Sequence, residues 1–194
     1  MPKTSVQPEE QPAHYYDSIY RDGYSIDHMQ PVYNAVLDIL RALNPPAQVL
    51  EIGCGIGVFG EMVVDAGFKY HGFDFSIDAI RRCPDSIRTR VARKNAYHRS
   101  SFRVGHNVVV AIEVMEHLRD LEVVDMIAPD TICIFTVPNY TDEAHLRTYS
   151  DEKAIRNYYK GLIRWHRIQP IVMADDSGVS CGKKIIWVCK GVKI

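Results

Sequence analysis

The chain has 194 residues, a formal net charge of −1 at pH 7 and 46% apolar residues, values typical of one globular domain with a full hydrophobic core. The near-zero charge gives no overall field that would select nucleic acid, a membrane surface or an acidic substrate. Five widely spaced cysteines without a CxxC pair favour reduced thiols over a zinc cluster or a disulfide framework. There is no apolar run of membrane-spanning length and no signal peptide, so we expect a cytoplasmic protein.

The N-terminal quarter of the chain differs in pattern from the rest. Residues 1–13 are polar with three prolines, and we expect a flexible tail. Residues 14–47 begin with a cluster of tyrosines and continue with apolar residues at helical spacing over 27–43, until two prolines end the helix. We predict that 14–47 is a helical lid or cap and that 48–194 is the main domain.

Strands and helices alternate through the main domain. Apolar segments predict strands at 48–53, 70–74, near 88–92, at 107–113, 131–137, 165–173 and 183–190. Helices are predicted at 57–66, from a Ser76 cap to Arg82, at 115–127, and over 151–162 with a Ser150 cap. The loop 174–178 would close an antiparallel hairpin. The pattern predicts an α/β, Rossmann-like single domain with a seven-stranded, mostly parallel sheet and an antiparallel C-terminal strand.

A glycine-rich turn joins the first of these strands to its helix. Gly53, Gly55 and Gly57 crowd this turn, and the acid Glu51 precedes it. Glycines let backbone N–H groups approach a ligand closely, and the helix N-terminus offers further unpaired donors. The segment therefore predicts a binding site for a nucleotide-like ligand.

Asp74 ends the following strand, where an acid can accept two hydroxyls of a ribose. The turn also fits the G-x-G-x-x-G pattern of dinucleotide-binding enzymes. A dinucleotide needs a second half-domain, however, and the chain after residue 140 is too short for one. Glu51 also stands where dehydrogenases usually run apolar into the loop. We therefore disfavour NAD and FAD.

Three segments in order resemble the class I S-adenosylmethionine-dependent methyltransferases: Val49–Gly57, Gly72–Ser76 and Ile112–Leu118. Ile134–Asn139 supplies the usual fifth strand, and the resemblance covers about 48–140. The resemblance implies that the cofactor is S-adenosylmethionine.

The resemblance also implies roles for single residues. Gly53, Gly55 and Gly57 would face the methionine part of the cofactor, and Glu51 would organise their loop. Asp74 would hold the ribose hydroxyls, Phe75 would pack on the adenine, and Glu113 would border the same crevice. Where the family often has Asp-Ala near the adenine amino group, this chain has Asn95-Ala96, and an Asn carbonyl still accepts that hydrogen bond.

The segment Glu113–His117 carries the candidate chemistry at the acceptor end. If a helix begins near Val114, then Glu113, Glu116 and His117 share one face. We predict His117 as the base, with Glu113 and His145 as further catalytic candidates. Glu113, Glu116 and His117 together would also suit a divalent ion such as Mg²⁺. A metal site, a metal-free base and a structural role stay open.

The same cluster resembles two subgroups, the quinone-pathway O-methyltransferases, which are closest in motif, and the small-RNA 3′-terminal 2′-O-methyltransferases. We predict O-methylation of a small molecule. The alternatives are an RNA 2′-O-methyltransferase and a non-catalytic S-adenosylmethionine-binding partner subunit. Residues 81–103 hold eight Lys or Arg against one acid, which is either a solvated edge or a surface for RNA or a carrier protein. Nothing in the sequence points to DNA.

Overall fold

The computed structural model describes residues 9–23, 26–44, 46–173 and 183–194. Most of the tail expected at 1–13, and the loop expected at 174–178, lie outside these residues. Within the described part of the chain, no helix combines the length and the apolar character needed to cross a bilayer.

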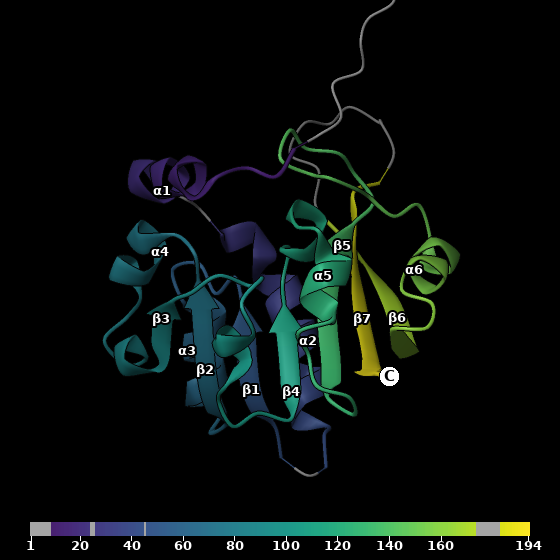
Figure 1. Cartoon of the computed structure of the whole chain (residues 1–194), viewed down its shortest axis with the longest axis horizontal. Helices are drawn as coiled ribbons and strands as arrows, with labels where there is room; N and C mark the ends of the chain where they lie inside the picture. The colour runs from purple at the N-terminus through teal and green to yellow at the C-terminus, as the bar shows by residue number, and fades with distance from the viewer. Residues whose placement is uncertain (1–8, 24–25, 45, 174–182) are drawn as a thin grey trace, which may run out of the picture.

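A seven-stranded sheet forms the centre of the molecule, in the order β3-β2-β1-β4-β5-β7-β6 (Figure 1). Its strands are β1 (Gln48–Ile52), β2 (Lys69–Asp74), β3 (Val91–Arg93), β4 (Val108–Ala111), β5 (Ile132–Pro138), β6 (Ile163–Val172) and β7 (Ile185–Lys193). The first five pair in parallel, and β7 runs antiparallel to both of its neighbours. The predicted mostly parallel sheet with an antiparallel C-terminal strand is therefore confirmed.

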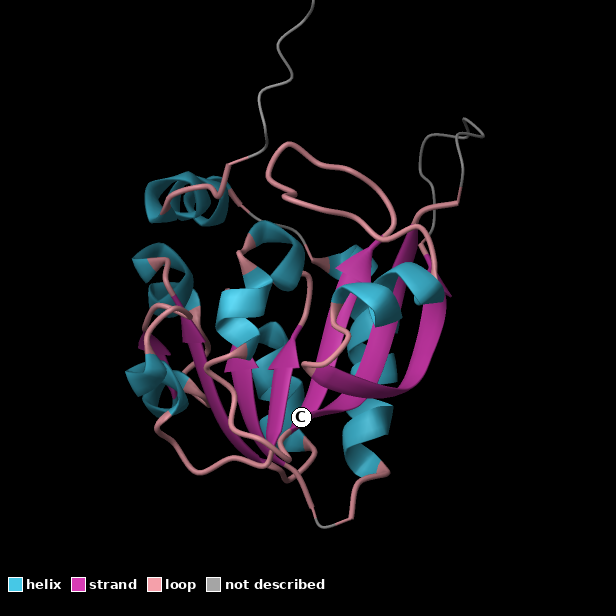
Figure 2. Cartoon of the chain, turned by 45° about the vertical axis from the view of Figure 1, so that its right-hand side comes forward, coloured by secondary structure: helices cyan, strands magenta, loops and turns pink. Residues whose placement is uncertain are grey.

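Helices cover both faces of this sheet (Figure 2). They are α1 (Ala13–Asp22), α2 (Gln30–Arg41), α3 (Val58–Asp65), α4 (Ile77–Arg82), α5 (Asp120–Val124) and α6 (Glu152–Tyr158), with 3₁₀ turns at η1 (Asp27–Met29), η2 (Arg88–Arg90), η3 (Arg99–Phe102) and η4 (Met115–His117). Because side chains alternate along a strand, Val49 packs with α2 and α3, whereas Leu50 packs in the cluster that includes α5 and α6.

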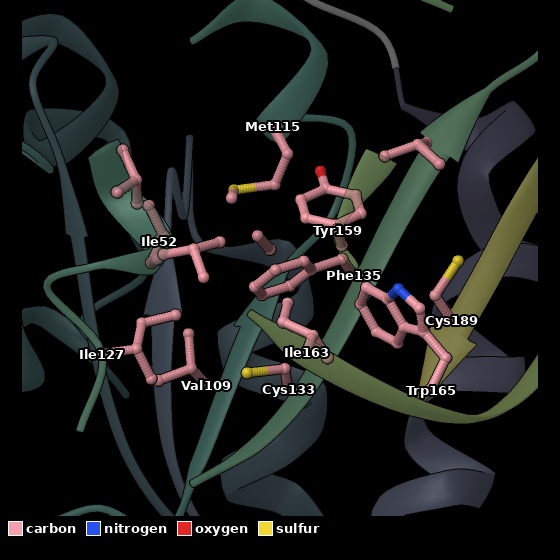
Figure 3. Packing of buried hydrophobic residues seen from close by; sticks show 14 of the residues in the cluster. Ile52, Val109, Met115, Ile127, Cys133, Phe135, Tyr159, Ile163, Trp165 and Cys189 are labelled. Carbon is pink, nitrogen blue, oxygen red and sulfur yellow. The ribbon is translucent and has the colours of Figure 1, made fainter. Parts of the chain in front are cut away.

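The core beside α5 and α6 is built on an aromatic cluster (Figure 3). The ring of Trp165 meets Phe135 and Tyr159 edge to face, with centroids 5.8 Å and 5.5 Å apart. The Tyr159 hydroxyl donates to Oδ2 of Asp120 at 2.5 Å, and Asp120 is itself fully buried. A polar group buried among these rings would be costly without such a partner, so the hydrogen bond fixes the ring in place.

Three local predictions were wrong in detail. The helix expected at 115–127 is broken into η4 and α5, because the Arg147 side chain takes the carbonyl oxygens of Met115 and Leu118. The last helix is capped by Asp151, whose carboxylate accepts from the Ala154 N–H, and not by Ser150. The short strand expected near 88–92 begins only at Val91, after the turn η2.

Close packing between the last two strands yields a first prediction. A Cβ at Gly191 would lie 2.7 Å from the carbonyl oxygen of Arg164 and 2.7 Å from Cε3 of Trp165. We expect Gly191→Ala to lower the free energy of unfolding, measured with urea, by about 1–3 kcal/mol through overpacking. Gly105→Ala is the control, since its Cβ would meet only Gln48 Oε1 at 3.9 Å. Equal destabilisation by the two changes would contradict this packing.

Candidate active site

The loops after β1, β2, β4 and β5 line one cavity of about 610 Å³. In the sheet, β2 and β3 lie on one side of β1, and β4 and β5 lie on the other, so the direction in which successive strands are added reverses at β1. This reversal is the point where ligands bind in open α/β sheets. Figure 1 shows that α1 and the segment after β5 stand above these strand ends, and residues of both segments line the cavity.

The glycine turn after β1 adopts backbone angles that favour glycine. Gly53, Gly55 and Gly57 have φ values of 66°, 53° and 83°. A Cβ on Gly53 would lie 2.5 Å from Cγ2 of Val114, so the turn also needs glycine for space. Gly57 begins α3 without a side-chain cap, so the N–H groups of the first turn of this helix are open to a ligand.

Asp74 joins the turn after β1 to the turn after β2. Its Oδ2 accepts from the Gly55 N–H at 3.0 Å, and its Oδ1 accepts from the Ser76 N–H at 2.8 Å. Burial raises the pKa of Asp74 to about 6, although these backbone donors oppose the rise. The carboxylate lines the cavity, at the strand end predicted for a ribose-binding acid.

Glu51 lies beneath the glycine turn and lines the same cavity. It is 3% exposed, and its Oε2 accepts from the hydroxyl of Tyr70 at 2.5 Å. Burial raises the pKa of Glu51 to about 8, which the hydrogen bond from Tyr70 opposes. The acid is therefore held in a site that disfavours its charge.

The residues predicted near the adenine also line the cavity. The ring of Phe75 packs against Tyr16, with centroids 5.2 Å apart. Ala96 lies on the cavity wall next to Asn95. Oδ1 of Asn95 already accepts from the Tyr97 N–H at 2.8 Å, so a further hydrogen bond from a ligand would share that oxygen.

Glu113 occupies a strained position after β4. Its φ is 52°, a left-handed conformation that non-glycine residues rarely adopt. Thr136 fixes it from β5, because Oγ1 accepts from the Glu113 N–H at 2.8 Å and donates to Oε1 at 2.9 Å. Burial raises the pKa of Glu113 to about 7. The strain also means that Glu113 does not share a helix face with Glu116 and His117, as the sequence had suggested.

The structure instead groups Glu116, His117 and His145. One potential ligand atom from each of them lies within 4.8 Å of the others. Glu116 is fully buried, and neither of its carboxylate oxygens has a hydrogen-bond partner among the described residues. Burial, together with the charge of Glu113, raises the pKa of Glu116 well above its usual value. A buried carboxylate without a partner is costly, which points to a ligand.

Both imidazoles hold Nδ1 against a backbone carbonyl oxygen, and Nε2 of His117 lies 3.8 Å from Oε1 of Glu116. Nδ1 of His117 lies 3.0 Å from the carbonyl oxygen of Ala144, and Nδ1 of His145 lies 3.1 Å from that of Tyr140. A carbonyl only accepts, so each Nδ1 carries the proton, and Nε2 of the neutral ring keeps its lone pair. Burial lowers the pKa of His117 to about 4, which keeps this ring neutral at pH 7.

The segment that carries His145 is anchored to η4. The Leu146 N–H donates to the carbonyl oxygen of Glu116 at 2.8 Å. Nη1 of Arg147 donates to the carbonyl oxygen of Leu118 at 2.7 Å and to Oδ1 of Asp120 at 2.6 Å. Arg147 and Asp120 were not among the predicted site residues, because nothing in the local sequence pattern pairs residues so far apart in the chain.

Helix α1 covers the cavity without burying any of its residues. Tyr16 extends from it to Phe75 and to His117, with ring centroids 5.2 Å and 5.9 Å away. Polar contacts hold the helix on both sides: Tyr15 donates to Glu143 at 2.7 Å, and Asp17 accepts from Ser76 Oγ at 2.5 Å. Such a helix can separate from the sheet without exposing a hydrophobic core of its own.

With this geometry established, comparison with known proteins gives the family. Residues 26–169 match a family model described as a methyltransferase domain. The chain belongs to that family, the class I S-adenosylmethionine-dependent methyltransferases. It is 25% identical over 112 residues to the ubiquinone biosynthesis O-methyltransferase of Shewanella sp. (strain ANA-3), a match that takes in 52% of this chain and 48% of that protein. The chain therefore spans about half the length of this curated relative.

Solved structures share the fold at low sequence identity. A structure from work on the conversion of a disulfide bond into a thioacetal group in echinomycin biosynthesis matches with a TM-score of 0.69 and 15% identity, covering 94% of this chain and 93% of that one. Magnesium protoporphyrin IX methyltransferase of Synechocystis PCC 6803 with bound SAM matches with a TM-score of 0.62 and 13% identity, covering 95% of this chain and 93% of that one. The methyltransferase domain of bacterial CtHen1 matches with a TM-score of 0.57 and 18% identity, covering 84% of this chain and 99% of that one.

The buried carboxylate of Glu113 yields a second prediction, on stability against pH. Its pKa is raised by burial to about 7 in the folded chain from the ordinary glutamate value of 4.5, so between these two pH values the native state keeps a proton that the unfolded chain has lost. Stability is therefore lost as the pH rises between these two values. We expect Glu113→Gln to match the wild type near pH 4 and to be more stable by about 1–3 kcal/mol near pH 8.

Urea denaturation at both pH values measures this difference. Glu61→Gln is the control, since Glu61 is only partly buried and lies on α3 outside the cavity lining. A Glu113→Gln variant that is no more stable than the wild type near pH 8 would contradict the assigned burial cost.

Proposed function

We propose that this methyltransferase transfers the methyl group of S-adenosylmethionine to an oxygen atom of a small molecule. The observation that carries the proposal is the presence of two different sites in one cavity. The glycine turn and Asp74 lie on the β2 side, and the unpartnered carboxylate of Glu116 with two imidazoles lies on the β5 side.

The first site has the donors and acceptors that a sulfonium nucleoside needs. The cofactor supplies a methyl group already activated by its positive sulfur, so the protein has mainly to align an acceptor with it. Asp74 would accept the ribose hydroxyls while it holds the Gly55 N–H, and Phe75 would cover the adenine. Asn95 would contribute less, because its oxygen is already engaged.

The second site has the composition of a cation site. Metal-bound imidazoles commonly donate their other N–H to a backbone carbonyl, as His117 and His145 do. With the carboxylate of Glu116 they fit a borderline divalent ion such as Mn²⁺ better than Mg²⁺, which prefers oxygen ligands. An ion held there would lower the pKa of an acceptor hydroxyl.

The pKa values suggest how the catalytic roles divide. A pKa of about 4 makes His117 a weak proton acceptor but a good neutral ligand. Glu113, with a pKa of about 7, is better matched to take a proton near neutral pH. We therefore assign the cation to Glu116, His117 and His145, and proton removal to Glu113. This differs from the sequence-based expectation, which named His117 as the base.

The shortage of basic groups in the cavity lining, where Lys94 stands without any described arginine, favours a small, uncharged acceptor over RNA or a phosphate-bearing carrier protein. Seven carboxyl side chains and one lysine line it: Glu10, Glu51, Asp74, Glu113, Glu116, Asp142 and Glu143, with Lys94. Of the basic residues at 81–103, only Lys94 reaches this lining, so the others would not guide a phosphate to the transferred methyl group.

A non-catalytic cofactor-binding subunit is a weaker alternative. Such a subunit would not need a strained acid at Glu113 or an unpartnered one at Glu116, both of which reduce stability.

The four described cysteines are buried free thiols, which supports a reducing compartment such as the cytoplasm.

A third prediction tests the cofactor site. We expect Asp74→Asn to weaken binding of S-adenosylhomocysteine, measured by titration calorimetry, by about tenfold or more, because a charged acceptor of ribose hydroxyls is lost. Asp78→Asn is the matched control, since Asp78 lies on α4 and pairs with Arg21. If Asp74→Asn and the wild type bind equally, Asp74 does not hold the ribose.

A fourth prediction tests the cation. We expect Mn²⁺ to raise the melting temperature of the wild type, and Mg²⁺ to raise it less, because the ion binds only the folded chain and Mg²⁺ prefers oxygen ligands. We expect Glu116→Gln and His145→Gln to lose most of that rise, and Glu143→Gln to keep it. A melting temperature of the wild type that does not respond to either ion at millimolar concentration would overturn the cation site.

A further inference from the structure

The buried residue Tyr70 on β2 contacts the cofactor turn from below. Its ring lies along the face of β2 that packs with α2 and α3, and it is 1% exposed. Its hydroxyl donates to Oε2 of Glu51 on the neighbouring strand at 2.5 Å. Glu51 lines the cavity, whereas Tyr70 lies behind it and outside the lining, so Tyr70 can act on a ligand through its hydrogen bond to Glu51.

Two glycines make room for this ring. A Cβ on Gly60 of α3 would lie 2.4 Å from Cζ and 2.4 Å from the hydroxyl oxygen of Tyr70. A Cβ on Gly72 of β2 would lie 2.3 Å from the same oxygen. Any other residue at either position would push the hydroxyl away from Glu51. Neither glycine has a positive φ, so space for Tyr70 explains them better than backbone conformation does.

We propose that Tyr70 is a positioning residue for cofactor binding, which orients the Glu51 carboxylate and stabilises its ionised form beneath the glycine turn. This inference rests on the proposed S-adenosylmethionine site. An ionised Glu51 would attract the ammonium group at the methionine end of the cofactor, which the glycine turn is expected to face. A neutral Glu51 would not.

The groups around Glu51 make the hydroxyl of Tyr70 important. Asp74 adds a repulsive negative charge, and burial also disfavours the carboxylate. The thiols of Cys54 and Cys83 also lie near Tyr70 and Glu51. A thiol is either neutral or negative, so neither one can stabilise an ionised Glu51 as a cation would. Of the three influences on Glu51, which are burial, Asp74 and the hydrogen bond from Tyr70, this hydrogen bond is the one that favours the ionised form.

Tyr70→Phe keeps the ring and removes only this hydrogen bond. We expect the variant to bind S-adenosylhomocysteine about tenfold more weakly than the wild type near pH 7, which corresponds to a rise of about one unit in the pKa of Glu51. We expect the loss to shrink to about twofold near pH 9, where Glu51 is mostly ionised in the wild type and about half ionised in the variant. At each pH the affinity of the variant is divided by that of the wild type, so any titration of the ligand itself, which is the same for both proteins, cancels.

The control is Tyr159→Phe, which removes a hydrogen bond of equal length from a buried tyrosine to a buried carboxylate outside the cavity lining. It should lower the melting temperature and leave the affinity unchanged. In a double-mutant cycle, adding Tyr70→Phe to Glu51→Gln should cost no further affinity.

Equal affinity of Tyr70→Phe and the wild type, a loss that is the same at both pH values, or an additive loss in the Glu51→Gln background would overturn the role of Tyr70. A wild type that does not bind S-adenosylhomocysteine at all would instead overturn the proposed function. The two failures are therefore distinct.

Discussion

The carboxylate of Asp74 is the interaction on which the rest of the site depends. By accepting N–H groups from Gly55 and Ser76, it holds the turn after β1 against the turn after β2, and the parallel pairing of these strands brings the turns together. Ser76 in turn caps α4 and donates to Asp17 of α1. One buried acid therefore links the glycine turn, the second turn and the helix over the cavity, and it still lines the space where a ribose would lie.

Four acids that line the cavity, Asp74 among them, are held in sites that disfavour their charge. Burial raises the pKa of Glu51, Asp74 and Glu113 to about 8, 6 and 7, and it also raises the pKa of Glu116 well above its usual value. Such a cluster reduces the stability of the folded chain at neutral pH. A positively charged cofactor and a cation would offset this cost, so we infer that the site is built for its ligands at the expense of the free protein.

The parts of this structure that a sequence can predict are local ones. The alternation of strands and helices follows from hydrophobic periodicity, and the turn at Gly53–Gly57 follows from residues adjacent in the chain. The partners of these residues come from elsewhere: Tyr70 donates to Glu51 from β2, and the segment after β5 supplies Arg147 for Asp120.

The break between η4 and α5 is of the same kind. The apolar pattern after Val114 fits one continuous helix, but a distant arginine takes the carbonyl oxygens that would have continued it.

The central claim is that Asp74 and the glycine turn hold the cofactor. It is most directly tested by a crystal structure of the protein with S-adenosylhomocysteine. Our account predicts both ribose hydroxyls within hydrogen-bonding distance of the Asp74 carboxylate and the methionine end above Gly53–Gly57. A ligand bound with its ribose away from Asp74, or outside this cavity, would contradict it.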